Sequence, residues 1–113
     1  MRRIYHLVSP SLWNSLGTGP YRAASLETEG FIHCSNADQV AQAANRFYSD
    51  CAALLVLYID AGRLTHEVRD EPAQSGERFP HIYGPIHRDA VVHVQPLQRD
   101  GSGRWVFEEN AGA

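Results

Sequence analysis

Seven consecutive apolar residues, Ala53 to Ile59, constrain the fold of this chain more than any other feature. A strand with one face in water alternates between apolar and polar residues, whereas this segment is apolar on both alternations. Such a strand needs cover on both faces, so we expect residues 53–59 at the centre of a sheet. A chain of 113 residues can bury a core of this kind, and we expect a single domain over 1–113.

The remaining pattern predicts an α+β fold. Two helices are expected in the first half: a short one that Ser9 caps and Gly17 ends, and a clearer one over 37–48. Residues 21–29 indicate an irregular or one-turn helical passage. Because strands outnumber helices, we expect a mostly antiparallel sheet rather than a doubly wound fold. Those strands are predicted at residues 3–8, 31–35, 53–59, 65–69, 79–83, 90–94 and 104–108.

The segment Asp70 to Arg78 is rich in proline, glycine, serine and charge, and it is the one predicted loop long enough to act as a lid. Cys34 and Cys51 make no disulfide framework, which favours a reducing cytoplasm. No apolar run reaches membrane-spanning length, so we expect no membrane partner. The sequence leaves the oligomeric state open.

All ten basic residues are arginine. The absence of lysine excludes Schiff-base chemistry, a phosphate-loop lysine and a lysine general base within this chain. The formal net charge of −3 argues against a nucleic-acid surface. Six histidines remain for proton transfer near neutral pH.

Three of these histidines, His6, His33 and His81, lie in apolar or aromatic rows of predicted strands. Side chains two residues apart share a strand face, which places Phe31 and Ser35 beside His33. By the same rule Phe79 and Tyr83 share a face with His81. We hypothesise that the three imidazoles line one cleft; the alternative is that each is an ordinary strand histidine satisfied by backbone or water. His66, His87 and His93 lack comparable surroundings.

Other polar residues give weaker indications. Cys34 faces away from His33, so core packing is its expected role. No spacing clamps two metal ligands together, and we expect no metal site. Ser35 fits a helix cap better than a nucleophile. Arg69 could pair with a carboxylate or phosphate of a ligand, and Glu71 could swing toward the cleft.

Residues 4–6, 25–35 and 79–85, followed by Ala90 and Val91, resemble the bacterial domain-of-unknown-function family nine-five-two. The resemblance spans residues 3–97. That family is similar in fold to the ADP-ribosyltransferase-like superfamily, a compact α+β fold with a split, mostly antiparallel sheet whose cleft binds NAD in the active members. The resemblance implies this ADP-ribosylation-like fold here.

The resemblance also implies residue roles. His6 would contact the nicotinamide-side ribose, and His33 or Ser35 would support the nicotinamide end. Tyr83 would stack on the ligand or donate a hydrogen bond to it. The late motif lacks the glutamate that stabilises a ribosyl oxocarbenium ion, so ordinary ADP-ribosyl transfer to protein is not expected.

Two hypotheses of function follow. In the first, the cleft binds or processes NAD or a related nucleotide, with His6, His33 and His81 as catalytic residues and Ser35, Tyr83 and Arg69 as ligand-binding residues. If the protein is an enzyme, the reaction is NAD-dependent glycosyl or ADP-ribosyl transfer, or NAD hydrolysis. In the second, the domain binds a small ligand or a partner without turnover. No cofactor other than NAD as a substrate is indicated.

Overall fold

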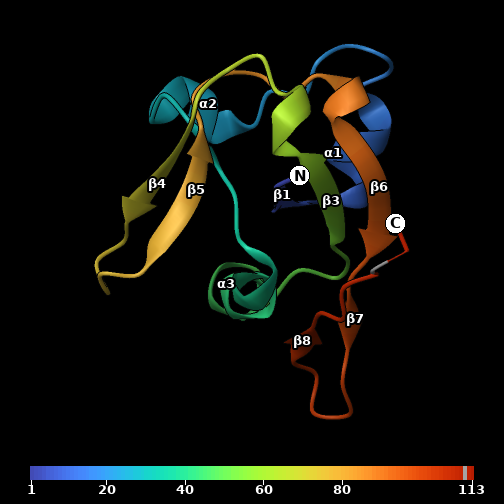
Figure 1. Cartoon of the computed structure of the whole chain (residues 1–113). Helices are drawn as coiled ribbons and strands as arrows, with labels where there is room; N and C mark the ends of the chain where they lie inside the picture. Colours follow the sequence, from blue (N-terminus) through green and yellow to red (C-terminus); the bar gives the residue numbers. More distant parts are fainter. Residues whose placement is uncertain (111) are drawn as a thin grey trace.

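The computed structural model describes residues 1–110 and 112–113. Its central strand is β3 (Leu55–Asp60), which lies between β1 (Arg3–Val8) and β6 (Val91–Pro96) and is antiparallel to both (Figure 1). Every β3 residue after Leu55 is buried. The prediction of a central strand covered on both faces is therefore confirmed.

A second antiparallel sheet has the order β2 (Ile32–His33), β5 (Arg78–Ile82), β4 (Val68–Pro72). One isolated bridge joins it to the first sheet. The N–H of Tyr5 donates to the carbonyl of Ser35 over 2.8 Å, and the N–H of Ser35 donates to the carbonyl of Tyr5 over 2.7 Å. The short hairpin of β7 (Gln98–Arg99) and β8 (Trp105–Val106) completes a compact α+β architecture of antiparallel strands.

Helices begin where the sequence offers caps. The Ser9 hydroxyl accepts from the N–H of Leu12 and starts α1 (Pro10–Ser15), and Gly17 follows with φ +63. A capping box of Asn36 and Gln39 starts the 3₁₀ turn η1 (Ala37–Gln39), which continues into α3 (Val40–Phe47). The remaining elements are α2 (Ala24–Thr28), η2 (Ala61–Arg63) and η3 (Arg88–Ala90).

The two faces of the first sheet carry two cores. On one face, Val56 and Tyr58 pack with Val40 and Ala44 of α3. On the other face, Leu57 and Ile59 belong to a cluster with buried residues of the second sheet, Ile32 and Ile82. Figure 1 shows α3 between the lower ends of the first sheet and the β4–β5 hairpin. Among the described residues, no helix has the length and apolar character needed to cross a membrane.

One prediction of secondary structure, the loop at 70–78, is corrected. β4 begins at Val68 and extends through Asp70 to Pro72, so the predicted loop 70–78 shortens to a turn, residues 73–77. Charged residues and proline are typical of loops, but an edge strand also tolerates them, and β4 is an edge strand. In α3, the last residue, Phe47, is 69% exposed.

Candidate functional site

A cavity of about 550 Å³ lies between the first sheet, α3 and the β4–β5 hairpin. This volume falls within the range of pockets that hold small molecules. The strands and turns contribute Tyr5, His6, Leu7, His33, Cys34, Ser35, Pro72, Ala73, Gln74, Ser75, Phe79 and His81. The helix α3 contributes Gln42, Ala43, Arg46 and Phe47, and the next residue, Tyr48, also lines the cavity.

Four of the six predicted site residues line this cavity: His6, His33, Ser35 and His81. The ring centroids of His33 and His81 are 5.2 Å apart, because the two residues pair directly across β2 and β5. The three histidines that were hypothesised to share a cleft are thus all in the lining of this cavity. Their predicted roles toward a ligand stay predictions.

His6 is buried, and both of its ring nitrogens are engaged. Nδ1 donates to the backbone carbonyl of His33 over 2.6 Å, and Nε2 accepts from the hydroxyl of Tyr21 over 2.8 Å. Burial lowers the pKa of His6 to about 4. His6 is therefore neutral at pH 7, and its hydrogen bonds hold β1 against β2 and against Tyr21.

His81 is held by a carboxylate and an aromatic ring. Its Nδ1 lies 2.9 Å from Oε1 of Glu71, and Phe31 stacks on the imidazole with centroids 4.1 Å apart and planes 16° apart. The Tyr83 hydroxyl donates to the same Glu71 oxygen. These hydrogen bonds, that of Tyr83 first, lower the pKa of Glu71, so its carboxylate stays ionised at neutral pH.

His33 is the most exposed of the three histidines, with 53% of its side chain accessible. Its Nε2 lies 3.0 Å from Oε2 of Glu29, four residues earlier in the chain. Gly30, at φ +87, makes the left-handed turn between Glu29 and Phe31. Each of the two more accessible histidines thus has its own carboxylate partner, Glu29 or Glu71.

Two predicted ligand-binding residues lie outside the cavity lining. Arg69 is exposed and committed to Glu67, with two nitrogens each 3.0 Å from a carboxylate oxygen. Its guanidinium also lies 4.4 Å from the ring centroid of Tyr83. Tyr83 supports Glu71 instead of lining the cavity.

The arginine that lines the cavity is Arg46, in the last turn of α3. It lies over the ring of Phe47 at 5.3 Å and makes no ion pair with the described residues. The lining as described contains this one guanidinium and no carboxylate. Sequence reasoning missed Arg46 because an arginine at the polar end of an amphipathic helix has the pattern of a solvated residue.

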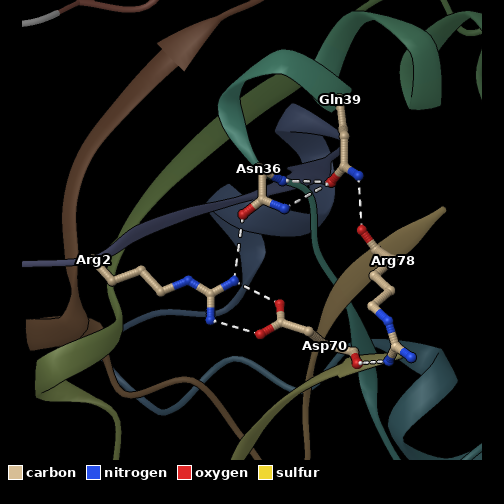
Figure 2. Close-up of polar contacts among 5 residues, drawn as sticks. All are labelled: Arg2, Asn36, Gln39, Asp70 and Arg78. Atoms are coloured by element: carbon tan, nitrogen blue, oxygen red, sulfur yellow. Dashed lines mark hydrogen bonds and ion pairs between the residues drawn. The ribbon is translucent and has the colours of Figure 1, made fainter. Parts of the chain in front are cut away.

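A polar network fastens the β4–β5 hairpin to the rest of the molecule (Figure 2). Arg2 pairs with the carboxylate of Asp70 over 2.6 and 3.0 Å and reaches Oδ1 of Asn36 over 3.4 Å. The buried Gln39 accepts from Asn36 through its side-chain oxygen and donates to the carbonyl of Arg78 over 2.8 Å. These contacts fix the position of β4 and β5 relative to α3.

Cys34 is buried in the core, and burial raises the pKa of its thiol, so it is a poor nucleophile at pH 7. Among residues 1–110 and 112–113, no group of three or more histidine, cysteine, aspartate or glutamate side chains is arranged to hold a metal ion. The polar side chains described in the cavity lining carry imidazoles, hydroxyls, amides, one guanidinium and the thiol of Cys34.

These features define a small α+β domain with a histidine-lined cavity. The family described as "Protein of unknown function (DUF952)" matches residues 7–94, and the chain belongs to this family. The chain is also similar to protein CC0527 from Caulobacter crescentus. The two sequences are 28% identical, and the crystal structure of CC0527 matches this structure with a TM-score of 0.82. The match covers 93% of this chain and 94% of that chain. The solution NMR structure of CC0527, also at 28% sequence identity, matches with a TM-score of 0.77 and covers 92% of this chain and 91% of that chain. A comparison with curated proteins finds no match.

Proposed function

We propose that the cavity binds a small-molecule nucleotide, with NAD as the first ligand to test. The observation that carries this proposal is the composition of the lining. In a protein of net charge −3, the described residues that line the cavity supply one guanidinium, three imidazoles and no carboxylate. An anionic ligand fits such a lining better than a cation does. The volume of about 550 Å³ suits a ligand of nucleotide size.

The lining supplies both types of contact that a nucleotide requires. Because the chain has no lysine, Arg46 is the cation that would hold a phosphate in the cavity. Phe47, Tyr48 and Phe79 offer aromatic surfaces on which a base or a nicotinamide ring could stack. In this proposal Arg46 takes the ligand-binding role that the sequence assigned to Arg69.

The ADP-ribosyltransferase-like fold belongs to the same proposal. Its support is the split between two antiparallel sheets that meet at Tyr5 and Ser35, next to the cavity. In that arrangement His6, His33 and Ser35 would face the nicotinamide end of the ligand. The protein would act in the cytoplasm, where both free cysteines, Cys34 and Cys51, stay reduced.

A second function is ligand binding without turnover. The observation that favours it is that both ring nitrogens of His6 are already hydrogen-bonded within the protein. A histidine in this state can shape the cavity but has no nitrogen free for proton transfer. Nicotinamide release from NAD distinguishes an enzyme from such a binding domain.

The test is calorimetric titration and thermal denaturation with NAD, ADP-ribose and nicotinamide. We expect saturable NAD binding, and a ligand at 100 times its Kd raises the free energy of unfolding by about 2.7 kcal/mol. Arg46→Gln should weaken NAD binding roughly tenfold or more, since a hydrogen bond to a charged group is worth about 1.5–3 kcal/mol. Arg69→Gln is the matched control and should leave the affinity unchanged. The absence of any shift at millimolar ligand would contradict the proposal.

A further inference from the structure

The environments of the two ring nitrogens of His81 differ. Nδ1 is held 2.9 Å from Oε1 of Glu71, whereas Nε2 has no hydrogen-bond partner among the described residues. The imidazole is only 13% exposed and lines the cavity, and Phe31 stacked at 4.1 Å limits its rotation. Nε2 is therefore the nitrogen available to a molecule in the cavity.

Glu71 determines which tautomer His81 adopts. An ionised carboxylate can only accept a hydrogen bond, so Nδ1 of the neutral imidazole carries the proton and Nε2 carries the lone pair. Glu71 stays ionised because the Tyr83 hydroxyl and His81 both donate to Oε1, which lowers the pKa of the carboxyl group. The same hydrogen bond raises the pKa of Tyr83, so this hydroxyl remains a donor at neutral pH.

The groups around the pair are consistent with proton acceptance at Nε2. His33 lies on the neighbouring strand with its ring centroid 5.2 Å away, and its own Nε2 is paired with Glu29. Asp70, the neighbour of Glu71 on β4, is bound to Arg2. Arg69 is paired with Glu67 and lies over the Tyr83 ring. The charge that would develop on His81 therefore faces one dedicated carboxylate, that of Glu71.

We propose that His81, positioned by Glu71, is a general base that activates a water molecule for hydrolysis of the ligand; this inference rests on NAD binding in the cavity. Nε2 of His81 takes a proton as one O–H bond of water breaks. The water oxygen forms a bond to C1′ of the nicotinamide ribose, and the bond from C1′ to the nicotinamide nitrogen breaks with its electron pair on nicotinamide. The products are ADP-ribose, nicotinamide and a proton, which leaves the imidazolium for solvent.

Nicotinamide release tests this step. His81→Gln should lower the rate at least about 100-fold, the usual minimum for loss of a general base, while NAD affinity changes less than about threefold. Glu71→Gln should lower kcat roughly tenfold and leave the KM for NAD unchanged, because the imidazolium that forms loses a charge-assisted hydrogen bond. A purely structural role of Glu71 would change KM together with kcat. Glu27→Gln, on α2 and outside the cavity lining, is the matched control.

The outcomes separate the two proposals. NAD binding without nicotinamide release from the wild-type protein overturns the general base and leaves the binding function standing. No NAD binding overturns the binding function and this step with it. A third measurement needs no ligand: ¹⁵N NMR should show the neutral His81 ring protonated at Nδ1 in the wild-type protein. A ring protonated at Nε2 overturns the inference whatever NAD does.

Discussion

His6 and His81 line the same cavity, but they differ in whether a ring nitrogen is free to transfer a proton. His6 is fully engaged, with one nitrogen donating to a backbone carbonyl and the other accepting from Tyr21. His81 has one nitrogen fixed by Glu71 and one without a partner among the described residues. The number of free ring nitrogens, rather than proximity to the cavity, separates a residue that holds the structure from one able to transfer a proton.

The buried state of His6 makes the protein sensitive to acid. Its pKa is lowered from 6.5 to about 4 on folding, so the unfolded chain binds the proton more tightly. The contribution of the neutral, buried His6 to the free energy of unfolding is complete above pH 6.5 and is lost as the pH falls from 6.5 to about 4. Between pH 7 and pH 4.5 we expect this residue to account for a loss on the order of 2 kcal/mol in the free energy of unfolding, measured by urea denaturation.

His6→Gln is the variant that isolates this effect. Glutamine keeps a donor and an acceptor for the His33 carbonyl and the Tyr21 hydroxyl but does not titrate. The difference in stability between pH 7 and pH 4.5 should shrink by on the order of 2 kcal/mol in the variant. An unchanged difference would show that other groups cause the acid sensitivity.

For single residues, the sequence indicated which histidines share the cavity but not which side chains bind to their ring nitrogens. Period-two alternation predicted the strand faces of His6, His33 and His81, and all three residues are in the cavity lining. Two of their hydrogen-bond partners are more distant: Glu71 lies ten residues before His81, and Tyr21 lies fifteen residues after His6. Such pairings depend on strand register, which local patterns do not encode.

At the scale of elements, the β4–β5 hairpin determines one wall of the cavity. Pro72 at the end of β4 and the turn residues 73–75 belong to the lining, opposite the side chains of α3. Glu77 at the end of the turn accepts from Gln39 over 3.0 Å and from Gln42 over 2.9 Å, so the turn is tied directly to α3. Glu77 thus anchors the turn itself, in addition to the contacts of Asp70 and Arg78 that hold the strands of the hairpin.

Glu77→Ala should loosen this turn without unfolding the protein. The variant loses the hydrogen bonds from Gln39 and Gln42, and each is worth about 1 kcal/mol. We expect the amides of Ala73 and Gly76, which close the turn, to exchange with deuterium roughly tenfold faster. Glu27→Ala is the control and should leave exchange there unchanged. A large drop in melting temperature for Glu77→Ala would instead assign this carboxylate to global stability.

Elements that carry strong local signals were predicted well. The central strand, α1 with its Ser9 cap, and the helix after Asn36 all appear within two residues of the expected bounds. β4 was misplaced because its residues Asp70 to Pro72 are typical of a loop, and pairing with β5 overrides that local preference. β7, only two residues long, carries no periodic signal at all.

At the scale of the whole molecule, β3 is the element on which both cores depend. Leu57, fully buried, belongs to the cluster shared with the second sheet, whereas its neighbours Val56 and Tyr58 belong to the cluster under α3. Neither core would be complete without this strand. That arrangement explains why an apolar segment with no polar alternation is required here.

Leu57→Ala should therefore be among the most damaging single changes. Truncation of a buried leucine costs about 2–5 kcal/mol, which is a large fraction of the 5–15 kcal/mol typical of a domain. Leu12→Ala, at a residue 42% exposed on α1, is the control and should change the free energy of unfolding by about 0.5 kcal/mol or less. Chemical denaturation measures both; equal effects would contradict the assignment of Leu57 to the core.

The pairing order of β3 also bears on how the protein is made. Synthesis proceeds from the N-terminus, and β3 pairs with β1 on one edge but with β6, which ends at Pro96, on the other. At about 5–20 residues per second, a ribosome needs about 2–7 s to advance from Asp60 to Pro96. Until β6 pairs with it, β3 is an apolar strand with one open edge, the kind of edge that pairs with other chains. Newly made chains are thus most prone to aggregate before β6 has joined the sheet.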